Sequence, residues 1–279
     1  MDDDLFVVNM EHVTVKNVEI PALGLGTYRL KGSTCVFAVK EALGMGYRHI
    51  DTAESYGNHR EVGRAILESG VDREEIFLTT KVWKTNLAYE MVLESGDKSL
   101  RELGLDYVDL LLIHWPSSMV PVAETLEAMN RLREEGKVRH IGVSNFSVGQ
   151  MKDAIKSSEI PILTNQVKYN PYHPQDKILE FCAENDIMLT AYTPLAKGRV
   201  VDNEVLSRIG RRYGKTPAQV TLRWLLQQDG VSAIPKASSK DHLRENFDIF
   251  DFELTDDEMR KVFELRGGII DRIVSKFSF

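Results

Sequence analysis

The sequence predicts an α/β protein with a (β/α)8 TIM barrel, an N-terminal β-hairpin and extra C-terminal helical segments. Strand-like and helix-like segments alternate eight times, and no Gly/Ser-rich linker interrupts them. Several strands, such as residues 110–113, are apolar on both faces, as buried parallel strands covered by helices are. Eight units in about 250 residues fit a closed barrel better than an open doubly wound sheet. We therefore expect one barrel domain over residues 1–279.

The expected elements begin with a hairpin over residues 13–23, where apolar and polar residues alternate around Lys16-Asn17. We expect this hairpin to plug or cover part of the main fold. The first two barrel helices are expected over residues 34–43 and 60–68. The expected strands cover residues 23–27, 47–51, 76–81, 107–114, 138–144, 162–166, 188–192 and 231–236.

Three later helices carry start signals. Ser147, Thr216 and Thr255 each precede a helical pattern and are followed three residues on by Gln or Glu, which is the pattern of a capping box. Material beyond the eight units is expected over residues 201–213 and after Asn246.

Composition excludes several classes of protein. With 43% hydrophobic and 28% charged residues, the chain suits a globular core, and no run reaches the roughly 18 apolar residues of a membrane span. The acidic start, residues 1–8, is unlike a signal peptide, so we expect a cytoplasmic protein. The formal net charge of -7 argues against a nucleic-acid partner but leaves room for a local basic pocket. Cys35 and Cys182 are expected to be reduced core residues.

Familiar short motifs fail here. The segment from Gly24 begins like a dinucleotide fingerprint but has Arg29 where its third glycine belongs. Gly214-Lys215-Thr216 lacks the first glycine of a phosphate loop and fits a helix end followed by a helix start. The seven histidines show no metal-ligand spacing, so no metal site is expected.

The ends of the expected strands carry polar groups. Active sites of barrels gather at the C-terminal ends of the strands. A polar or ionisable residue closes nearly every strand from the second onward: Asp51, Lys81, His114, Ser144-Asn145, Asn165-Gln166, Tyr192 and Lys236.

Four of these groups suit proton transfer to an oxygen atom. Tyr56 is a poor acid alone, but an ammonium such as Lys81 beside it is expected to lower its pKa, and Asp51 would keep that lysine charged. His114 could hold a substrate oxygen in line with the phenol. No nucleophile or metal accompanies them, so a redox cofactor is implied. Taken singly, each residue also has an ordinary structural explanation: a helix cap, a half-buried ring, a surface lysine or a packed loop histidine.

These residues resemble those of the aldo-keto reductase superfamily across essentially the whole chain. The resemblance rests on the following motifs, in this order: G-x-R-H-I-D-T-A-x-x-Y-G at residues 46–57, the Lys81 strand, L-L-L-I-H-W-P at 110–116, G-V-S-N-F at 142–146, N-Q-V at 165–167 and I-P-K at 234–236.

The resemblance implies a reductase of aldehydes and ketones that binds NADPH in extended form. It implies Tyr56 as general acid, Lys81 and Asp51 as its partners, and His114 orienting the carbonyl. The implied cofactor contacts are Gly26, Thr27, Tyr28, Asp51, Ser144, Asn145, Gln166, Tyr192, Thr193, Leu195, Lys236, Ser238, Ser239, His242 and Asn246. The implied substrate contacts are Tyr28, Trp83, His114 and Trp115; the two tryptophans are either core aromatics or an apolar wall.

The chain departs from the family pattern at the adenosine end. His242 stands where many members carry an arginine that grips the 2′-phosphate, and Ala237 replaces a common serine. A largely neutral imidazole lacks the permanent charge of a guanidinium. We therefore expect NADPH to be favoured through Lys236 while NADH is also usable. A short tail after Arg266 implies an open pocket and broad substrate use.

Two other functions stay open at this stage. One is a non-catalytic cofactor-binding regulator on the same barrel; the intact set of Asp51, Tyr56, Lys81 and His114 argues against it. The other is a hydrolase using Asp51 and Glu54, which lie only three residues apart and do not obviously flank a substrate. Otherwise Glu54 has no assigned role and is expected to be a solvated loop carboxylate. We expect a monomer acting on a small carbonyl compound.

Overall fold

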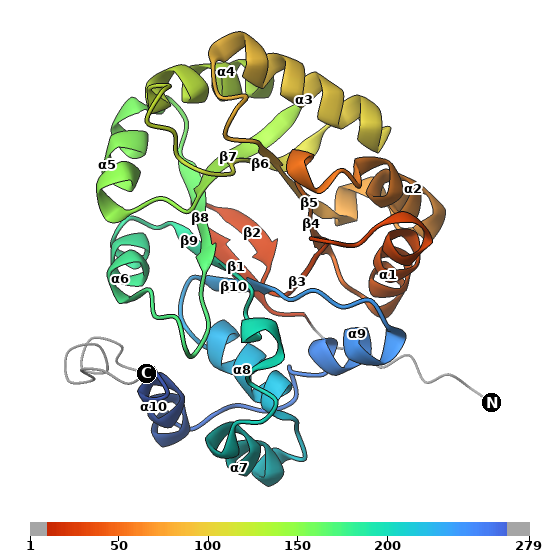
Figure 1. Ribbon diagram of the computed structural model, residues 1–279, viewed down its shortest axis with the longest axis vertical. Helices are drawn as coiled ribbons and strands as arrows, with labels where there is room; N and C mark the ends of the chain where they lie inside the picture. Colours follow the sequence, from red (N-terminus) through yellow and green to blue (C-terminus); the bar gives the residue numbers. More distant parts are fainter. Residues whose placement is uncertain (1–9, 267–279) are drawn as a thin grey trace.

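Eight parallel strands form a barrel inside a ring of helices in the computed structural model, which describes residues 10–266 (Figure 1). Strand order follows the chain, and pairing of Leu23 with Ala233 brings the first and last strands together. The Gly26 N–H donates to the Pro235 carbonyl at 3.1 Å across the same junction. The predicted (β/α)8 barrel is confirmed. Its strands are β3 (Gly24–Gly26), β4 (His49–Asp51), β5 (Phe77–Val82), β6 (Val108–Ile113), β7 (Val138–Ser144), β8 (Ile162–Lys168), β9 (Met188–Tyr192) and β10 (Val231–Ile234).

Helices follow the strands and cover the outside of the barrel. The described α-helices are α1 (Gly32–Met45), α2 (His59–Ser69), α3 (Tyr89–Leu103), α4 (Val122–Glu134), α5 (Val148–Ser157), α6 (Asp176–Glu184), α7 (Glu204–Tyr213), α8 (Pro217–Leu226), α9 (Lys240–Phe247) and α10 (Asp256–Glu264). The short 3-10 helices are η1 (Glu54–Tyr56), η2 (Arg73–Glu75) and η3 (Ala196–Gly198).

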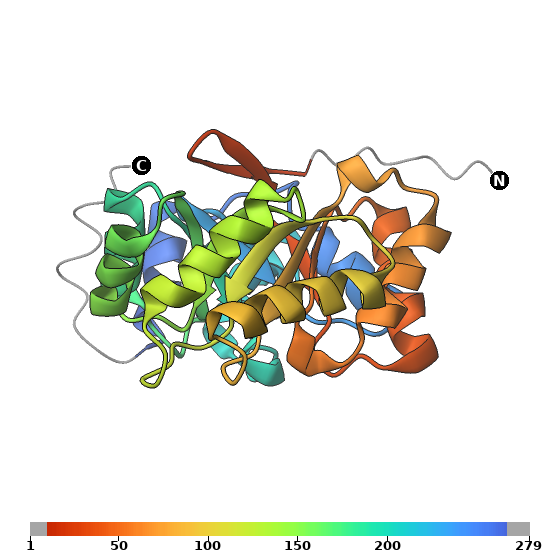
Figure 2. The same ribbon diagram turned by 90° about the horizontal axis from the view of Figure 1, so that it is seen from above.

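The hairpin expected before the barrel is present. β1 (His12–Val15) and β2 (Val18–Pro21) pair antiparallel, and the turn residues Lys16 and Asn17 have φ of 49° and 61°. Two successive positive φ values are typical of a type I′ turn, whose twist suits a two-residue hairpin loop. Figure 2 shows the hairpin lying across one end of the barrel. Because β3 starts directly after β2, that is the N-terminal end, opposite the strand ends that carry the polar groups.

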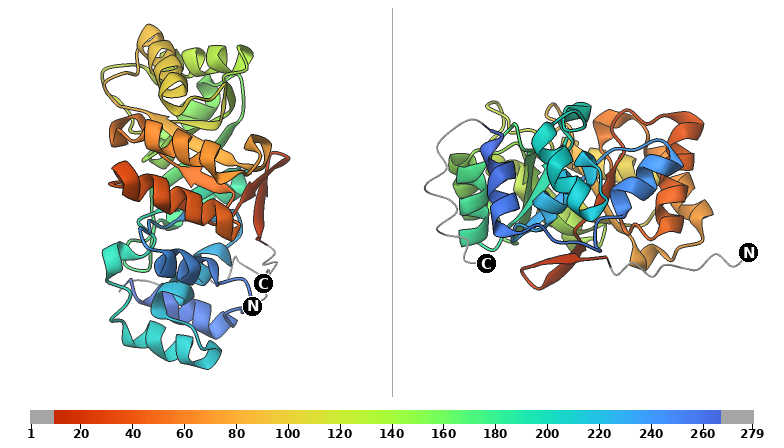
Figure 3. Two further views of the ribbon diagram at one scale, coloured as in Figure 1. Left: turned by 90° about the vertical axis from the view of Figure 1, so that its right-hand side faces the viewer. Right: turned by 90° about the horizontal axis from the view of Figure 1, so that it is seen from below.

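The predicted helix starts are confirmed. Ser147, Thr216 and Thr255 each accept a backbone hydrogen bond three residues on, and each is half of a complete capping box. The extra material expected over residues 201–213 and after Asn246 includes α7 and α10, which pack together beside α8 (Figures 1 and 3).

Two expectations lie outside the described residues: the interpretation of the acidic residues 1–8, and the short tail that follows Arg266. Within residues 10–266, no helix has both the length and the apolar character needed to cross a membrane. No group of three or more His, Cys, Asp or Glu side chains within that range could hold a metal ion.

Candidate active site

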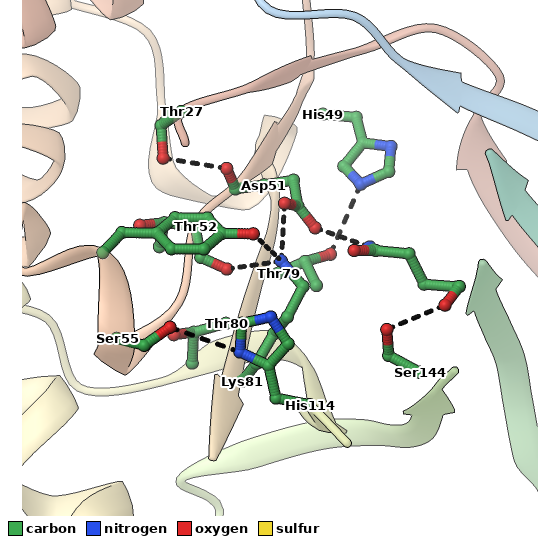
Figure 4. A network of polar contacts seen from close by, with 12 residues as sticks. Thr27, His49, Asp51, Thr52, Ser55, Thr79, Thr80, Lys81, His114 and Ser144 are labelled. Carbon is green, nitrogen blue, oxygen red and sulfur yellow. Dashed lines mark hydrogen bonds and ion pairs between the residues drawn. The ribbon is translucent and has the colours of Figure 1, made fainter. Parts of the chain in front are cut away.

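Side chains from three neighbouring strands meet at the C-terminal face of the barrel. Asp51 is the last residue of β4, Lys81 lies near the end of β5, and His114 follows β6 directly. Because β4, β5 and β6 are parallel and adjacent, their ends open on one face. Figure 4 shows Asp51 and Lys81 joined by a dashed line, with His114 nearby. Tyr56 reaches the same place from η1, five residues after Asp51.

The Lys81 ammonium is the centre of the hydrogen-bond network. Its Nζ donates to Asp51 Oδ1 at 2.6 Å, to the Thr52 carbonyl at 2.8 Å and to the Tyr56 hydroxyl oxygen at 3.3 Å. Burial lowers the pKa of Lys81, and the Asp51 carboxylate opposes that shift. Three acceptors around Nζ match the three hydrogens of an ammonium group. Because Lys81 donates to the phenol oxygen, the proton of Tyr56 points away from Lys81 Nζ.

The pKa of Tyr56 differs from the expected direction. Burial and the Asp51 carboxylate raise the pKa of Tyr56 above its ordinary value, whereas Lys81 was expected to lower it. The positive charge of Lys81 is balanced by Asp51 at 2.6 Å, which accounts for the weak influence on the phenol. Tyr56 is therefore a neutral phenol that carries its proton, as a donor must.

His114 is a neutral imidazole beside the phenol. Burial, with the nearby charge of Lys81, lowers the pKa of His114 to about 3. The rings of Tyr56 and His114 lie edge to face with centroids 5.8 Å apart. The Nδ1 atom lies 3.4 Å from the Ser55 hydroxyl, which is a long contact. A neutral imidazole offers one N–H donor at neutral pH.

A second polar cluster adjoins Asp51. Gln166 Nε2 donates to Asp51 Oδ2 at 2.7 Å, and the backbone carbonyl of Gln166 accepts from the Ser144 hydroxyl at 2.7 Å. The Tyr192 hydroxyl donates to Asn145 Oδ1 at 2.8 Å, and Asn145 Nδ2 donates to Ser144 Oγ at 3.0 Å. These four residues, all of them expected cofactor contacts, are thus neighbours. In this structure their polar atoms bond mainly to one another and to backbone.

The three cofactor contacts expected at the end of the first strand, Gly26, Thr27 and Tyr28, differ in burial. A Cβ at Gly26 would lie 2.7 Å from the Ile234 carbonyl, so this glycine is needed for barrel closure. Thr27 is buried and both its N–H and its hydroxyl donate to the Asp51 carbonyl at 2.9 Å. Tyr28 is 55% exposed, and its ring lies 5.1 Å from that of Tyr56. Of the three, only Tyr28 presents its side chain to the surface.

The residues expected at the adenosine end lie in the segment before α9 and on that helix. Ser239 caps the helix and accepts a bond from the His242 N–H at 3.3 Å. Lys236, Ser238 and His242 are exposed there, whereas Asn246 is buried. Thr193, with φ of 53°, and the half-buried Leu195 lie on the loop that follows β9.

Two tryptophans stand at the rim. The Trp83 ring lies edge-on to that of His114, with centroids 5.1 Å apart, and Trp83 is half-buried. Trp115 is 41% exposed. Neither is therefore a fully buried core aromatic, which favours the interpretation as an apolar wall.

Two residues that support the site, Asn58 and Glu54, were not predicted from the sequence to do so. Asn58 is fully buried, donates to the Thr27 and Leu30 carbonyls at 3.0 and 3.1 Å, and accepts from the Thr52 hydroxyl at 2.8 Å. The expectation for Glu54 was wrong. Its carboxylate accepts three hydrogen bonds from protein groups and is only partly exposed. Asparagine after glycine is typical of an ordinary turn, so no local pattern indicated the role of Asn58.

The barrel places this polar cluster at its C-terminal face, where barrel enzymes have their active sites. Comparison with known proteins gives the family. Residues 22–266 match the model of the Aldo/keto reductase family. The chain belongs to that family and is an oxidoreductase enzyme.

Curated relatives have reductase names. A glyoxal reductase of Bacillus subtilis is 45% identical over 246 residues, covering 88% of each chain. A 9,11-endoperoxide prostaglandin H2 reductase of Trypanosoma cruzi is 45% identical over 262 residues, covering 92% of each. A methylglyoxal reductase of Escherichia coli O157:H7 is 40% identical over 259 residues, covering 92% of this chain and 96% of the relative. These similarities support carbonyl reduction.

Solved structures of aldo-keto reductases are similar to this chain in fold and sequence. A Bombyx mori aldo-keto reductase in complex with NADP has a TM-score of 0.86 and 32% identity, covering 98% of both chains. A thermostable aldo-keto reductase in complex with the inhibitor epalrestat has a TM-score of 0.88 and 40% identity, covering 92% of this chain and all of that one (100%).

Proposed function

We propose that this enzyme reduces an aldehyde or ketone to the alcohol with a hydride from NADPH, with Tyr56 as the general acid, and that it also accepts NADH. The observation that carries the proposal is the position of Lys81 Nζ, which bonds Asp51 and Tyr56 at once. The reaction is reversible, because the same groups can accept the proton that they give.

The side chains of the protein supply the proton for the reduction. Tyr56 is neutral, its proton points away from Lys81, and it donates that proton to the oxygen that becomes the alcohol. Lys81 bonds the phenol oxygen and stabilises the phenolate left behind, while Asp51 keeps the ammonium in place. His114, as a neutral imidazole, orients the carbonyl by donating a ring N–H. The catalytic set is therefore Asp51, Tyr56, Lys81 and His114.

The residues beside Asp51 fit a nicotinamide cofactor. The Tyr192 hydroxyl is fixed by Asn145, which orients the aromatic ring for stacking, and Ser144, Asn145 and Gln166 offer amide and hydroxyl groups for a carboxamide. When bound, the reduced nicotinamide supplies the hydride. At the other end, exposed Lys236, Ser238 and His242 at the start of α9 would hold the adenosine phosphate.

The cofactor preference depends on His242. Without a guanidinium at this position, Lys236 is the main charged partner for a 2′-phosphate, so we infer a modest preference for NADPH over NADH. Dissociation constants of both cofactors, measured by quenching of protein fluorescence, test this inference. His242→Arg should tighten NADPH more than NADH, whereas His12→Arg at the far end of the barrel should change neither. A preference of about a thousandfold for NADPH in the unaltered enzyme, roughly 4 kcal/mol, would contradict it.

The substrate proposed is a small carbonyl compound, held at the rim by Tyr28, Trp83 and Trp115. Two relatives carry the names glyoxal reductase and methylglyoxal reductase, which supports small dicarbonyls as a first choice. We further infer that residues 1–279 act as one domain and as a monomer. The hydrolase alternative is not favoured, because Asp51 is bonded to Lys81 and Gln166 while Glu54 holds a loop.

The deciding experiment is loss of reduced-nicotinamide absorbance with a panel of aldehydes. Tyr56→Phe removes only the acid's hydroxyl and should lower kcat by about a hundredfold or more, the usual contribution of general acid catalysis. Tyr107→Phe is the matched control, because it removes a phenol hydroxyl just before β6, at the opposite end of that strand from His114. Turnover of Tyr56→Phe within twofold of the unaltered enzyme would refute the assignment.

A further inference from the structure

We propose that Glu54 is a positioning residue that fixes the wall of the carbonyl site, acting through Trp83, and so sets which carbonyl compounds fit. The inference rests on the proposed function, because it concerns the substrate side of the same site.

The Glu54 carboxylate binds the segment that follows β5. Its Oε2 accepts from the Trp83 backbone N–H at 3.0 Å and from the Ser95 hydroxyl at 2.9 Å, and its Oε1 accepts from Asn86 Nδ2 at 2.7 Å. Ser95 is buried on α3. The carboxylate therefore joins η1, the loop after β5 and α3 at a single point.

The loop that Glu54 holds is a tight turn. The Asn86 N–H donates to the Trp83 carbonyl at 2.8 Å, which closes residues 83–86 into one turn. The Glu54 carboxylate accepts from the backbone of Trp83, the first residue of this turn, and from the side chain of Asn86, the last residue. Both ends of the turn are thus fixed, and so is the starting point of the Trp83 side chain.

The same residue also belongs to the turn of the proposed acid. The Glu54 carbonyl accepts from the Gly57 N–H at 3.2 Å, so its backbone helps to form the η1 turn around Tyr56. The Trp83 ring stands edge-on to His114, which in turn faces the Tyr56 ring. Glu54 therefore fixes the separation between the acid and the apolar wall opposite the space for the carbonyl compound.

A carboxylate is suited to this position because all three partners are donors. Two oxygen atoms with free lone pairs can accept all three bonds, whereas glutamine would place an NH2 group against one donor and alanine would leave all three without this acceptor. The cost of unpaired donors would let the turn over residues 83–86 rearrange. This rearrangement should weaken binding of a large carbonyl compound that contacts Trp83. It should not affect a small one that contacts only Tyr56 and His114.

The first test measures the kinetics of Glu54→Ala, Glu54→Gln and the unaltered enzyme on two substrates, methylglyoxal and 4-nitrobenzaldehyde. NADPH is the cofactor in every assay. For Glu54→Ala, KM for the aromatic aldehyde should rise about tenfold or more, while kcat for methylglyoxal and the NADPH dissociation constant change less than about threefold. Glu54→Gln should lie between Glu54→Ala and the unaltered enzyme. Glu90→Ala, which removes an exposed carboxylate on α3, should change neither substrate. An equal loss of kcat/KM for both aldehydes in Glu54→Ala, or no change of kcat/KM for either, would overturn the proposal.

The second test needs no turnover. In a Trp115→Phe background, Trp83 and the buried Trp224 are the tryptophans that remain. Adding Glu54→Ala should increase acrylamide quenching through Trp83, and Asn86→Ala should do so to a smaller extent. If the unaltered enzyme reduces no aldehyde, the proposed function fails while this measurement still decides the role of Glu54. Unchanged quenching in Glu54→Ala would overturn that role.

Discussion

Single residues decide the chemistry of this site, and Lys81 is the residue whose surroundings are most constrained. It is fully buried, and its charge is tolerated because Asp51, equally buried, lies 2.6 Å away. A buried ion pair need not stabilise the fold relative to apolar residues, but removing one partner leaves an uncompensated charge. The pair is therefore better explained by the proposed chemistry than by stability.

Lys81→Met should abolish reductase activity and lower the free energy of unfolding by about 3–5 kcal/mol, because Asp51 would be buried without its cation. The double variant Asp51→Asn with Lys81→Met should recover much of the stability and none of the activity. Urea unfolding and the absorbance assay check both statements. Lys240→Met, which breaks an exposed pair with Glu41, should cost less than about 1 kcal/mol. A double variant less stable than the single one would contradict this explanation.

His114 makes a separate prediction for the pH dependence of activity. Its pKa is lowered to about 3, so the imidazole gains a proton only well below neutral pH. The kcat/KM for carbonyl reduction should therefore show no transition near pH 6.5, the ordinary value for histidine. A pH profile from about 5 to 8 measures this. A transition near pH 6.5 that disappears in His114→Asn would show that the imidazole titrates there.

At the scale of elements, capping and turn chemistry were readable in the sequence and strand ends were less so. Capping boxes at Ser147, Thr216 and Thr255 and the Lys16-Asn17 turn appear as expected, because short-range hydrogen bonds decide them. The last barrel strand was expected to run to residue 236 but ends at Ile234, since Pro235 has no N–H to continue the ladder.

Tyr47 shows how a tertiary contact overrides a local pattern. The sequence placed it in the second barrel strand, but β4 begins at His49. The Tyr47 hydroxyl instead donates to the Leu243 carbonyl on α9 at 3.0 Å. That partner lies 196 residues further along the chain, so no local pattern could have indicated it.

α10 gives a prediction about one element. Glu258 lies at its third position, is buried, and accepts bonds from Arg212 and the Tyr213 hydroxyl on α7, both at 2.6 Å, and from Thr255. Thr255→Ala removes the cap and the hydroxyl that donates to Glu258, leaves the two bonds from α7 in place, and should cost about 1 kcal/mol. Glu258→Ala leaves several donors unpaired and should cost about 3 kcal/mol or more. Thermal unfolding measures both, and equal losses in the two variants would contradict the ranking.

At the scale of the whole molecule, the proposed site follows from topology. Parallel strands that follow one another in a barrel present their C-terminal ends on one face, so a census of strand-end residues was enough to bring Asp51, Lys81 and His114 together. Asn58 and Glu54 were not predicted as part of the site, because their roles depend on loops whose positions the strand pattern does not predict. The pKa of Tyr56 was also missed, because burial outweighs the nearby ammonium only when the full packing is known.

Buried histidines make the stability of the whole molecule depend on pH. Burial lowers the pKa of His49, His59 and His114, so each is neutral in the folded protein at neutral pH. The unfolded chain binds protons at these side chains as the pH falls below about 6.5, while the folded protein does not until the pH reaches the lowered values. The free energy of unfolding should therefore decrease as pH falls from about 6.5, by up to about 1.4 kcal/mol per pH unit for each histidine.

Urea unfolding at several pH values between about 7.5 and 5 measures that slope. His49→Gln removes a titrating group inside the barrel, where the ring contacts the Thr79 hydroxyl and the Pro21 carbonyl, both at 3.3 Å. The variant should be less stable at neutral pH but should lose stability less steeply on acidification. His12→Gln, at an exposed position of β1, should keep the full slope. Because proton uptake by the unfolded chain is the cause, an unchanged slope in His49→Gln would remove this histidine from the explanation.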